Sequence, residues 1–277
     1  MKRNKIILVA ALAMVFVGLV ISGAAMAMGT AMENDIKEMK EYTATSDITK
    51  INIVLDIDDV NIVGSSSDKV KVTYYTSNIT ECNIKEENKT LTVESTGKKG
   101  TKWYDFIDFD FSRDNKVTIE VPKELQTEII SEVELGDTEI IDIKGKVDIK
   151  NACGDIKVSG CDFTDMKCIG QLGDIEIDNS VSTDMVISQE CGDIELDKTT
   201  GNMDVTCELG DINIDRISGD KLKFDNSCGD IEGTIAGSEG DYKITTSKSN
   251  TLKDSTTRTK TLDVNNNCGD IDILFVK

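Results

Sequence analysis

The chain has 277 residues, of which 31 are basic and 51 acidic, and its formal net charge is −20. So acidic a chain is a poor ligand for nucleic acid, because contacts to phosphates require a basic surface. It contains no histidine, which removes the commonest general base and the commonest metal ligand. These exclusions leave cations and basic proteins as the partners that the acidity would attract.

Residues 1–32 are expected to target or anchor the protein. Two lysines and one arginine lie among the first five residues, and residues 6–32 are uncharged. A helix needs roughly 20 residues to cross a bilayer, so this run is long enough. The basic residues would hold the N-terminus in the cytoplasm and place the rest of the chain outside. Residues 25–27 (Ala-Met-Ala) also fit a signal cleavage site, but the length of the run favours one retained transmembrane helix.

Residues 33–47 are predicted to form a linker, compatible with a helix as far as Tyr42. Strand patterns begin near Ile51, and degenerate coils are expected over residues 48–134. The evidence is a pair of segments whose spacing, and whose alternation of apolar and polar residues, match those of a later pair. Leu91-Thr92-Val93 indicates a further weak coil. The two pairs are Asp59-Val60-Asn61-Ile62 with Asp68-Lys69-Val70-Lys71-Val72, and Asp211-Ile212-Asn213-Ile214 with Asp220-Lys221-Leu222-Lys223-Phe224.

Residues 97–115 interrupt this pattern with a glycine-bounded loop and an aromatic stretch that holds the only tryptophan. From Ile107 onward, apolar and acidic residues alternate as they do in a strand. We interpret the stretch as a hairpin folded onto the coil. The alternative is an exposed contact surface for a partner or a membrane, made by Trp103, Tyr104, Phe106 and Phe109.

The dominant signal is a Gly-Asp pair that recurs seven times over residues 135–277. Successive pairs follow one another at a near-constant interval, except for a last gap of two periods, which suggests one copy that has lost its signature. A fixed period near twenty is typical of a solenoid, so the pattern predicts an all-β solenoid (β-helix) with about 19 residues per coil. The pairs are Gly136-Asp137, Gly154-Asp155, Gly173-Asp174, Gly192-Asp193, Gly210-Asp211, Gly229-Asp230 and Gly269-Asp270.

Each period contains two strand patterns, one after Gly-Asp and one before the next pair. Alternation places apolar residues inside and charged residues outside. The inward set of the second strand includes a polar column, whose stacked amides could bond along the coil. Continued alternation would end this set on the residue before glycine, where leucine and cysteine alternate. The polar column is Asn151, Gly170, Gln189, Cys207, Asn226, Thr246 and Asn266, and the last inward column is Leu135, Cys153, Leu172, Cys191, Leu209, Cys228 and Cys268.

The Gly-Asp pair itself is explained by a corner between strands. Glycine tolerates the positive φ of a tight turn, and aspartate can bond the backbone just after it. The alternative is a ladder of Ca²⁺ ligands, because Ca²⁺ prefers oxygen. We favour the structural interpretation and expect no cofactor. The candidate Ca²⁺ ligands are Asp137, Asp155, Asp174, Asp193, Asp211, Asp230 and Asp270.

The eight cysteines do not suggest a disulfide framework, although the chain is expected outside the cytoplasm. Cysteines in one column two coils apart would lie about 9–10 Å apart, beyond the roughly 7 Å between Cα atoms that a disulfide allows. Cys153, Cys191 and Cys228 are therefore expected to be small buried residues. A Cys161–Cys168 bond and any bond of Cys82 stay open.

No catalytic residues are expected. Some parallel β-helices are polysaccharide lyases or hydrolases that use clustered acids, and a polysaccharide-active enzyme is therefore one alternative. Here the acids repeat evenly, whereas a catalytic site usually breaks a repeat.

The chain resembles the putative-adhesin domain family of unknown function, which occurs in bacterial envelope proteins. The resemblance spans roughly residues 48–275 and rests on residues 59–62, on Val117-Thr118-Ile119-Glu120-Val121-Pro122 and on the Gly-Asp-Ile series. The family label implies attachment. Together with the leading apolar run, the uninterrupted repeat and the missing catalytic residues, it leads us to expect a membrane-anchored surface protein with an adhesin-like binding or scaffolding role toward an envelope protein or glycan. Some relatives are accessory proteins in envelope-stress responses, which gives a second alternative function.

Overall fold

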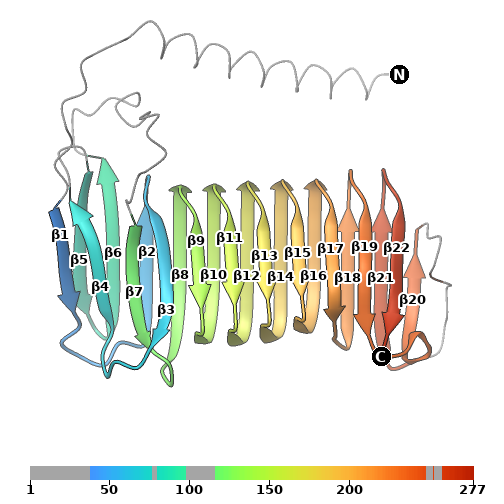
Figure 1. The fold of residues 1–277 in the computed structure, drawn as a ribbon, viewed down its shortest axis with the longest axis horizontal. Helices are drawn as coiled ribbons and strands as arrows, with labels where there is room; N and C mark the ends of the chain where they lie inside the picture. Colours follow the sequence, from blue (N-terminus) through green and yellow to red (C-terminus); the bar gives the residue numbers. More distant parts are fainter. Residues whose placement is uncertain (1–37, 77–79, 98–115, 248–251, 253–257) are drawn as a thin grey trace, which may run out of the picture.

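The computed structural model describes residues 38–76, 80–97, 116–247, 252 and 258–277. Within these ranges the chain forms two eleven-stranded sheets, sheet A and sheet B. They face each other across one hydrophobic core and make an elongated β-solenoid (Figure 1). The only helical element in the described ranges is the 3₁₀ turn η2 (Glu239–Asp241). The predicted all-β solenoid is confirmed.

The strands of each sheet lie side by side along the solenoid axis. From the N-terminal end, sheet A contains β1 (Glu38–Thr43), β4 (Lys71–Thr76), β7 (Lys116–Pro122), β3 (Asp59–Ser65), β9 (Thr138–Ile141), β11 (Ile156–Ser159), β13 (Ile175–Asp178), β15 (Ile194–Asp197), β17 (Ile212–Ile217), β19 (Ile231–Ala236) and β22 (Ile271–Val276). Sheet B contains β5 (Thr80–Glu87), β6 (Thr90–Gly97), β2 (Lys50–Leu55), β8 (Gln126–Leu135), β10 (Lys144–Cys153), β12 (Asp162–Leu172), β14 (Val181–Cys191), β16 (Thr200–Leu209), β18 (Lys221–Asn226), β21 (Lys260–Asn266) and β20 (Tyr242–Thr246).

Each regular coil consists of a long strand in sheet B, a Gly-Asp corner and a shorter strand in sheet A. Strands of successive coils pair in parallel, so equivalent residues stack directly on one another. The predicted alternation holds. Met166 and Cys168 of β12 point into the core opposite Ile156 and Val158 of β11, and all four are at most 2% exposed. Burial of such side chains stabilises the fold by roughly 1.5–3 kcal/mol each, which makes the core the main source of stability.

The repeat begins before the first Gly-Asp pair, as predicted. β2 and β3 form a complete coil that pairs with β8 and β9, and β6 and β7 form another coil outside it. The prediction is wrong for the second segment of the early pair, residues 68–72, because β4 does not enter sheet B. It turns back and pairs antiparallel with β7 and β1. Antiparallel strands here cover edges that a parallel coil would leave open.

The predicted linker contributes to this N-terminal end. Residues 38–42, which were expected to be compatible with a helix, instead form strand β1 together with Thr43. The Glu86 carboxylate holds the residues after β1, accepting hydrogen bonds from the Tyr42 hydroxyl at 2.7 Å and from the backbone N–H groups of Thr45 and Ser46 at 2.8 and 2.7 Å. The Ser46 hydroxyl also donates a hydrogen bond to this carboxylate. All of these bonds lower the pKa of Glu86, and the bond from the Ser46 hydroxyl has the largest effect.

The long gap before the last Gly-Asp pair does not contain a degenerate coil. β21 and β22 pair directly with β18 and β19. After β19 the chain passes through η2 into β20, which lies on the far side of β21 and ends sheet B. Tyr242 of β20 is buried against Phe275, with ring centroids 5.3 Å apart. The missing Gly-Asp pair is therefore explained by β20, which covers the C-terminal end of sheet B instead of forming another coil.

The proposed anchor lies outside the described residues, as does the aromatic stretch except for Gly97, which ends β6. No helix in the described ranges is both long and apolar enough to cross a membrane.

Candidate functional site

The Gly-Asp corners stack along one edge of the solenoid and form a continuous hydrogen-bonded ladder. In every coil the aspartate backbone N–H donates to Oδ1 of the aspartate in the preceding coil, over 2.7 to 2.9 Å. The prediction that each carboxylate braces its own turn is therefore wrong, because it bonds the next turn. The ladder starts at Asp59, which no glycine precedes, and continues through Asp137, Asp155, Asp174, Asp193, Asp211, Asp230 and Asp270.

Glycine is required at these corners for two reasons. Gly192 has a φ of 135°, and a Cβ atom placed on it would lie 1.8 Å from the carbonyl oxygen of Gly173 in the preceding coil. The other corner glycines have φ between 130° and 149° and similar contacts. Any larger residue would both strain the backbone and separate the coils.

Side chains of the polar column fill the inside of the corners, except at Gly170, which has no side chain. The Asn151 Nδ2 group donates to the Gly136 carbonyl at 2.8 Å, and Asn226 and Asn266 do the same for Gly210 and Gly229. The amides therefore bond turn carbonyls rather than one another. Thr246 does not belong to this column, because it pairs with Val264.

The residue before glycine points out of the solenoid, contrary to the predicted inward column. Leu135, Leu172 and Leu209 are about half exposed, at 50%, 49% and 48%. Cys153, Cys191 and Cys228 are partly exposed and Cys268 is exposed. The alternation fails here because the amide already occupies the corner and the chain is leaving sheet B.

The Ca²⁺ hypothesis gains no support from this geometry. One oxygen of each ladder carboxylate from Asp59 to Asp230 accepts a backbone N–H. In the part of the chain that the structure describes, no group of three or more Cys, Asp or Glu residues could hold a metal ion.

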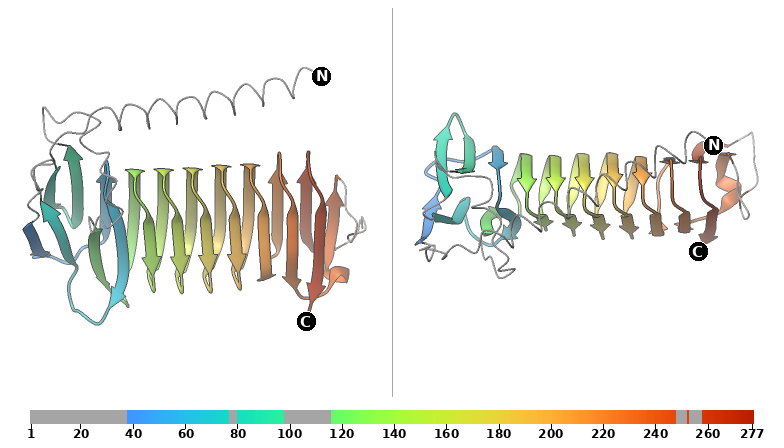
Figure 2. Two further views of the ribbon diagram at one scale, coloured as in Figure 1. Left: turned by 45° about the horizontal axis from the view of Figure 1, so that its top comes forward. Right: turned by 90° about the horizontal axis from the view of Figure 1, so that it is seen from above.

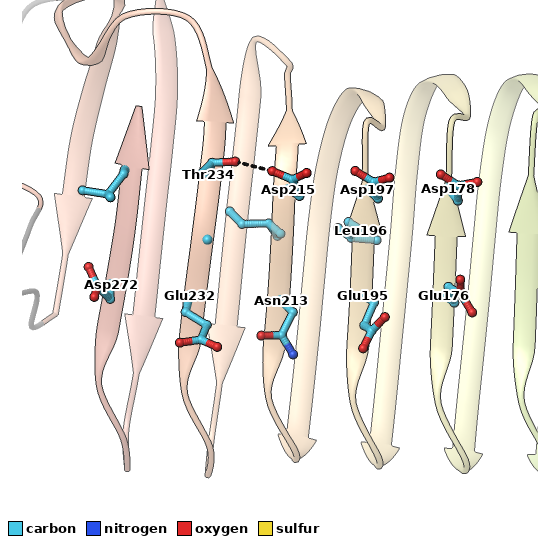
Figure 3. Close-up of a pocket in the computed structure, with 13 residues that line it drawn as sticks. Glu176, Asp178, Glu195, Leu196, Asp197, Asn213, Asp215, Glu232, Thr234 and Asp272 are labelled. Carbon is cyan, nitrogen blue, oxygen red and sulfur yellow. Dashed lines mark hydrogen bonds between the residues drawn. The ribbon is translucent and has the colours of Figure 1, made fainter. Parts of the chain in front are cut away.

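The outer face of sheet A carries two rows of acidic side chains over β13 to β22, which we call the acidic face (Figure 3). The rows follow the strand register, so Glu176 stacks on Glu195, Glu232 on Asp272, and the three aspartates of the second row on one another, while Asn213 interrupts the first row. They line a shallow groove of about 820 Å³. One row is Glu176, Glu195, Asn213, Glu232 and Asp272, and the other is Asp178, Asp197, Asp215 and Thr234.

Most of the acidic face lacks basic partners among the described residues. Glu176 pairs with Lys157 at 3.0 Å, at the N-terminal limit of the face. Lys198 and Arg216 each pair with the aspartate that precedes them, Asp197 and Asp215. The hydroxyl of Thr234 donates to Asp215 at 2.8 Å and lowers the pKa of that carboxyl.

Glu195, Glu232 and Asp272 form no ion pair with any described residue. Stacked carboxylates about 4.8 Å apart repel one another by roughly 1 kcal/mol in water. A cation or a row of basic side chains along the groove would relieve this repulsion. The arrangement can therefore bind positive ligands.

Sequence reasoning did not single out the acidic face. Its signal is present in the five Gly-Asp pairs from Gly173 to Gly269, because an acid stands two positions after the aspartate in four of them and four positions after it in three. These positions were interpreted only as the solvated side of a strand. Of the sites that were singled out, the aspartates form the ladder, and the four aromatic residues lie outside the described ranges.

All eight cysteines lie in the described ranges, and none is in a disulfide. Cys161 and Cys168, left open as a pair, are separately buried thiols. Burial raises the pKa of Cys168 to about 12 and that of Cys161 to about 11, which makes both poor nucleophiles.

Comparison with solved structures finds one with the same fold at a TM-score above 0.5 and others with lower scores. A putative adhesin from Bacteroides fragilis aligns with a TM-score of 0.58 and 15% identity, over 86% of this chain and 97% of that one. A putative adhesin from Parabacteroides merdae aligns with a TM-score of 0.42 and 14% identity, over 86% and 96%. A putative lipid binding protein from Parabacteroides distasonis gives 0.46 and 16%, over 86% and 96%. No curated protein matches the chain.

The family comparison covers most of the chain. The model described as Toastrack DUF4097 matches residues 48–274, which span the solenoid from β2 into β22. The chain therefore belongs to the Toastrack DUF4097 family.

Proposed function

We propose that the protein is a non-catalytic, membrane-anchored surface protein whose solenoid binds or scaffolds positively charged partners on the acidic face. The observation that carries this proposal is the run of carboxylates without basic partners in the described chain, Glu195, Glu232 and Asp272. A solenoid offers long regular faces, which suit extended ligands. The description of the Bacteroides fragilis structure with this fold as a putative adhesin supports a binding role.

The location follows from the N-terminal sequence. Residues 1–32 would hold the protein in the membrane, with the solenoid on the outer side. Mass spectrometry of the mature protein tests the anchor. An N-terminal peptide from before residue 25 supports retention, and a new N-terminus near residue 28 shows cleavage.

The binding proposal is tested by capturing envelope proteins and glycans on the full chain. The face variant, E195Q/E232Q/D272N, removes three carboxylates without changing the shape of the face. The matched control is the sheet B variant, E81Q/E94Q/D263N, which removes the same charge from exposed residues of sheet B.

We expect a basic partner to be retained by the wild type and by the sheet B variant but lost from the face variant, and the retention to weaken as salt rises. Equal retention by both variants, or no specific retention by the wild type, would refute the proposal. Release of sugar from cell-wall polysaccharide by the wild type would show an enzyme instead.

A further inference from the structure

The outside of the Gly-Asp edge carries a line of apolar side chains, which we call the corner stripe: Leu135, Cys153, Leu172, Cys191 and Leu209. Each residue pairs in register with the next, so the line runs straight along the solenoid axis. The view from above in Figure 2 shows the corners in one row. Leucine recurs at every second coil and is about half exposed each time.

The fold does not require leucine at these positions. The corner is already closed on its inner side by the polar column, and cysteine serves equally well in the alternate coils. Other exposed apolar residues of the described chain, such as Val181 and Val186, do not repeat along a line at two-coil intervals. Single exposed apolar residues are ordinary, whereas a continuous line of them marks a contact surface.

Carboxylates flank the corner stripe on both sides. One side carries the aspartate ladder in every coil. The other side carries the exposed Glu134, Glu190 and Glu208, none of which forms an ion pair with a described residue. A second copy of this chain, or an anionic membrane, would place negative charge against negative charge. The complementary surface is apolar along its middle and basic along both margins.

We propose that the corner stripe binds a basic amphipathic helix of a partner protein, laid along the solenoid axis. Coils are spaced about 4.8 Å apart. The apolar a and d positions of a helix recur on average about every 3.5 residues, or about 5.2 Å at roughly 1.5 Å per residue. The mismatch is about 0.4 Å per position, so about five positions meet the stripe before it amounts to half a coil. Lysine or arginine beside the helix seam then lies over the two rows of carboxylates.

The proposal concerns a surface other than the acidic face, and it can hold or fail independently of the proposed function. The probe is a synthetic helical peptide of three heptads, with leucine at a and d and lysine at the flanking e and g positions. Its affinity for the full chain is measured by calorimetry and compared with that of a peptide of scrambled sequence and identical composition.

The decisive variant is L135S/L172S/L209S. Its matched control is V181S/V186S/L274S, which replaces three similarly exposed apolar residues elsewhere. We expect the stripe variant to weaken binding by about tenfold or more, because burial of the leucines supplies most of the affinity. The control should bind as the wild type does. Thermal unfolding of both variants checks that the solenoid is intact.

Charge gives a second and independent reading. The edge variant, E134Q/E190Q/E208Q, removes three exposed carboxylates beside the corner stripe and should bind the peptide several-fold more weakly at low salt than the face variant does. Equal binding by the stripe variant and its control, equal binding of the scrambled peptide, or loss of binding in the face variant alone would each overturn the proposal.

Discussion

The two outer faces of the solenoid differ in how they treat charge, although they share one backbone period. On sheet B, lysines bridge neighbouring coils, as in Lys150–Glu132 at 2.6 Å and Lys223–Asp204 at 2.8 Å. Along the acidic face of sheet A such a bridge reaches only Glu176, and the next three acids of its row pair with no described lysine. The coil can therefore pair its surface charges, and the unpaired acids of sheet A are not required by the fold.

The largest effect should come from breaking what both faces share. Gly192→Ala places a methyl group against the preceding coil at a φ that alanine rarely adopts. We expect the free energy of unfolding to fall by about 3 kcal/mol or more, measured by denaturant titration. Gly240→Ala, where the nearest atom is 3.5 Å away, is the control and should be nearly neutral. Similar losses in both would show that coil spacing does not depend on the corner.

A smaller change should make sheet B resemble sheet A. Lys223 lies 2.8 Å from Asp204 and 2.9 Å from Asp225, so Lys223→Glu creates three adjacent acids. We expect a loss of about 1 kcal/mol at low salt that shrinks in high salt. Lys243→Glu on β20, which has no ion pair among the described residues, should cost less. A loss independent of salt would mean that packing of the lysine stem matters more than its charge.

The reverse change should make sheet A resemble sheet B. Glu195→Lys puts a lysine between Glu176 and Asn213 of the neighbouring strands. We expect the free energy of unfolding, measured by thermal unfolding, to rise by about 0.2–1 kcal/mol. Capture of basic partners should become weaker. Glu195→Gln separates removal of repulsion from formation of a new pair. Unchanged capture with either variant would contradict the role given to the acidic face.

The smallest effect is the pH dependence of the lysine pairs. Hydrogen bonds to Asp204 and Asp225 raise the pKa of Lys223 above its ordinary value. Its stabilisation is therefore complete below the unfolded pKa of about 10.4 and is lost as pH rises through the folded value. Between neutral and strongly alkaline pH, the free energy of unfolding of the wild type should fall by a few tenths of a kcal/mol more than that of Lys223→Gln. Parallel pH profiles for the two would contradict this.

Much of the fold was predictable because the repeat is a local pattern. Period, alternation and the corner glycines follow from backbone geometry within one coil, and even the degenerate coil at Asp59 kept its spacing. The errors lie where the pattern depends on other coils. The gap between Gly229 and Gly269 suggested a lost repeat because β20 follows β19 in the chain but lies beyond β21 in space. The acidic face went unrecognised because a solvated strand and a row of unpaired carboxylates look alike in one coil.

By itself the sequence determined an acidic solenoid and the length of its coil, since alternation and glycine placement leave few other structures for such a repeat. Only the tertiary structure decided which way each side chain points and what it contacts. It turned the leucines before Gly-Asp outward, because Asn151 and its counterparts fill the corners. It also made the aspartates into a ladder between coils, because parallel stacking brings each backbone N–H to the carboxylate of the coil before it. The sequence of a single repeat does not show which contacts form between coils.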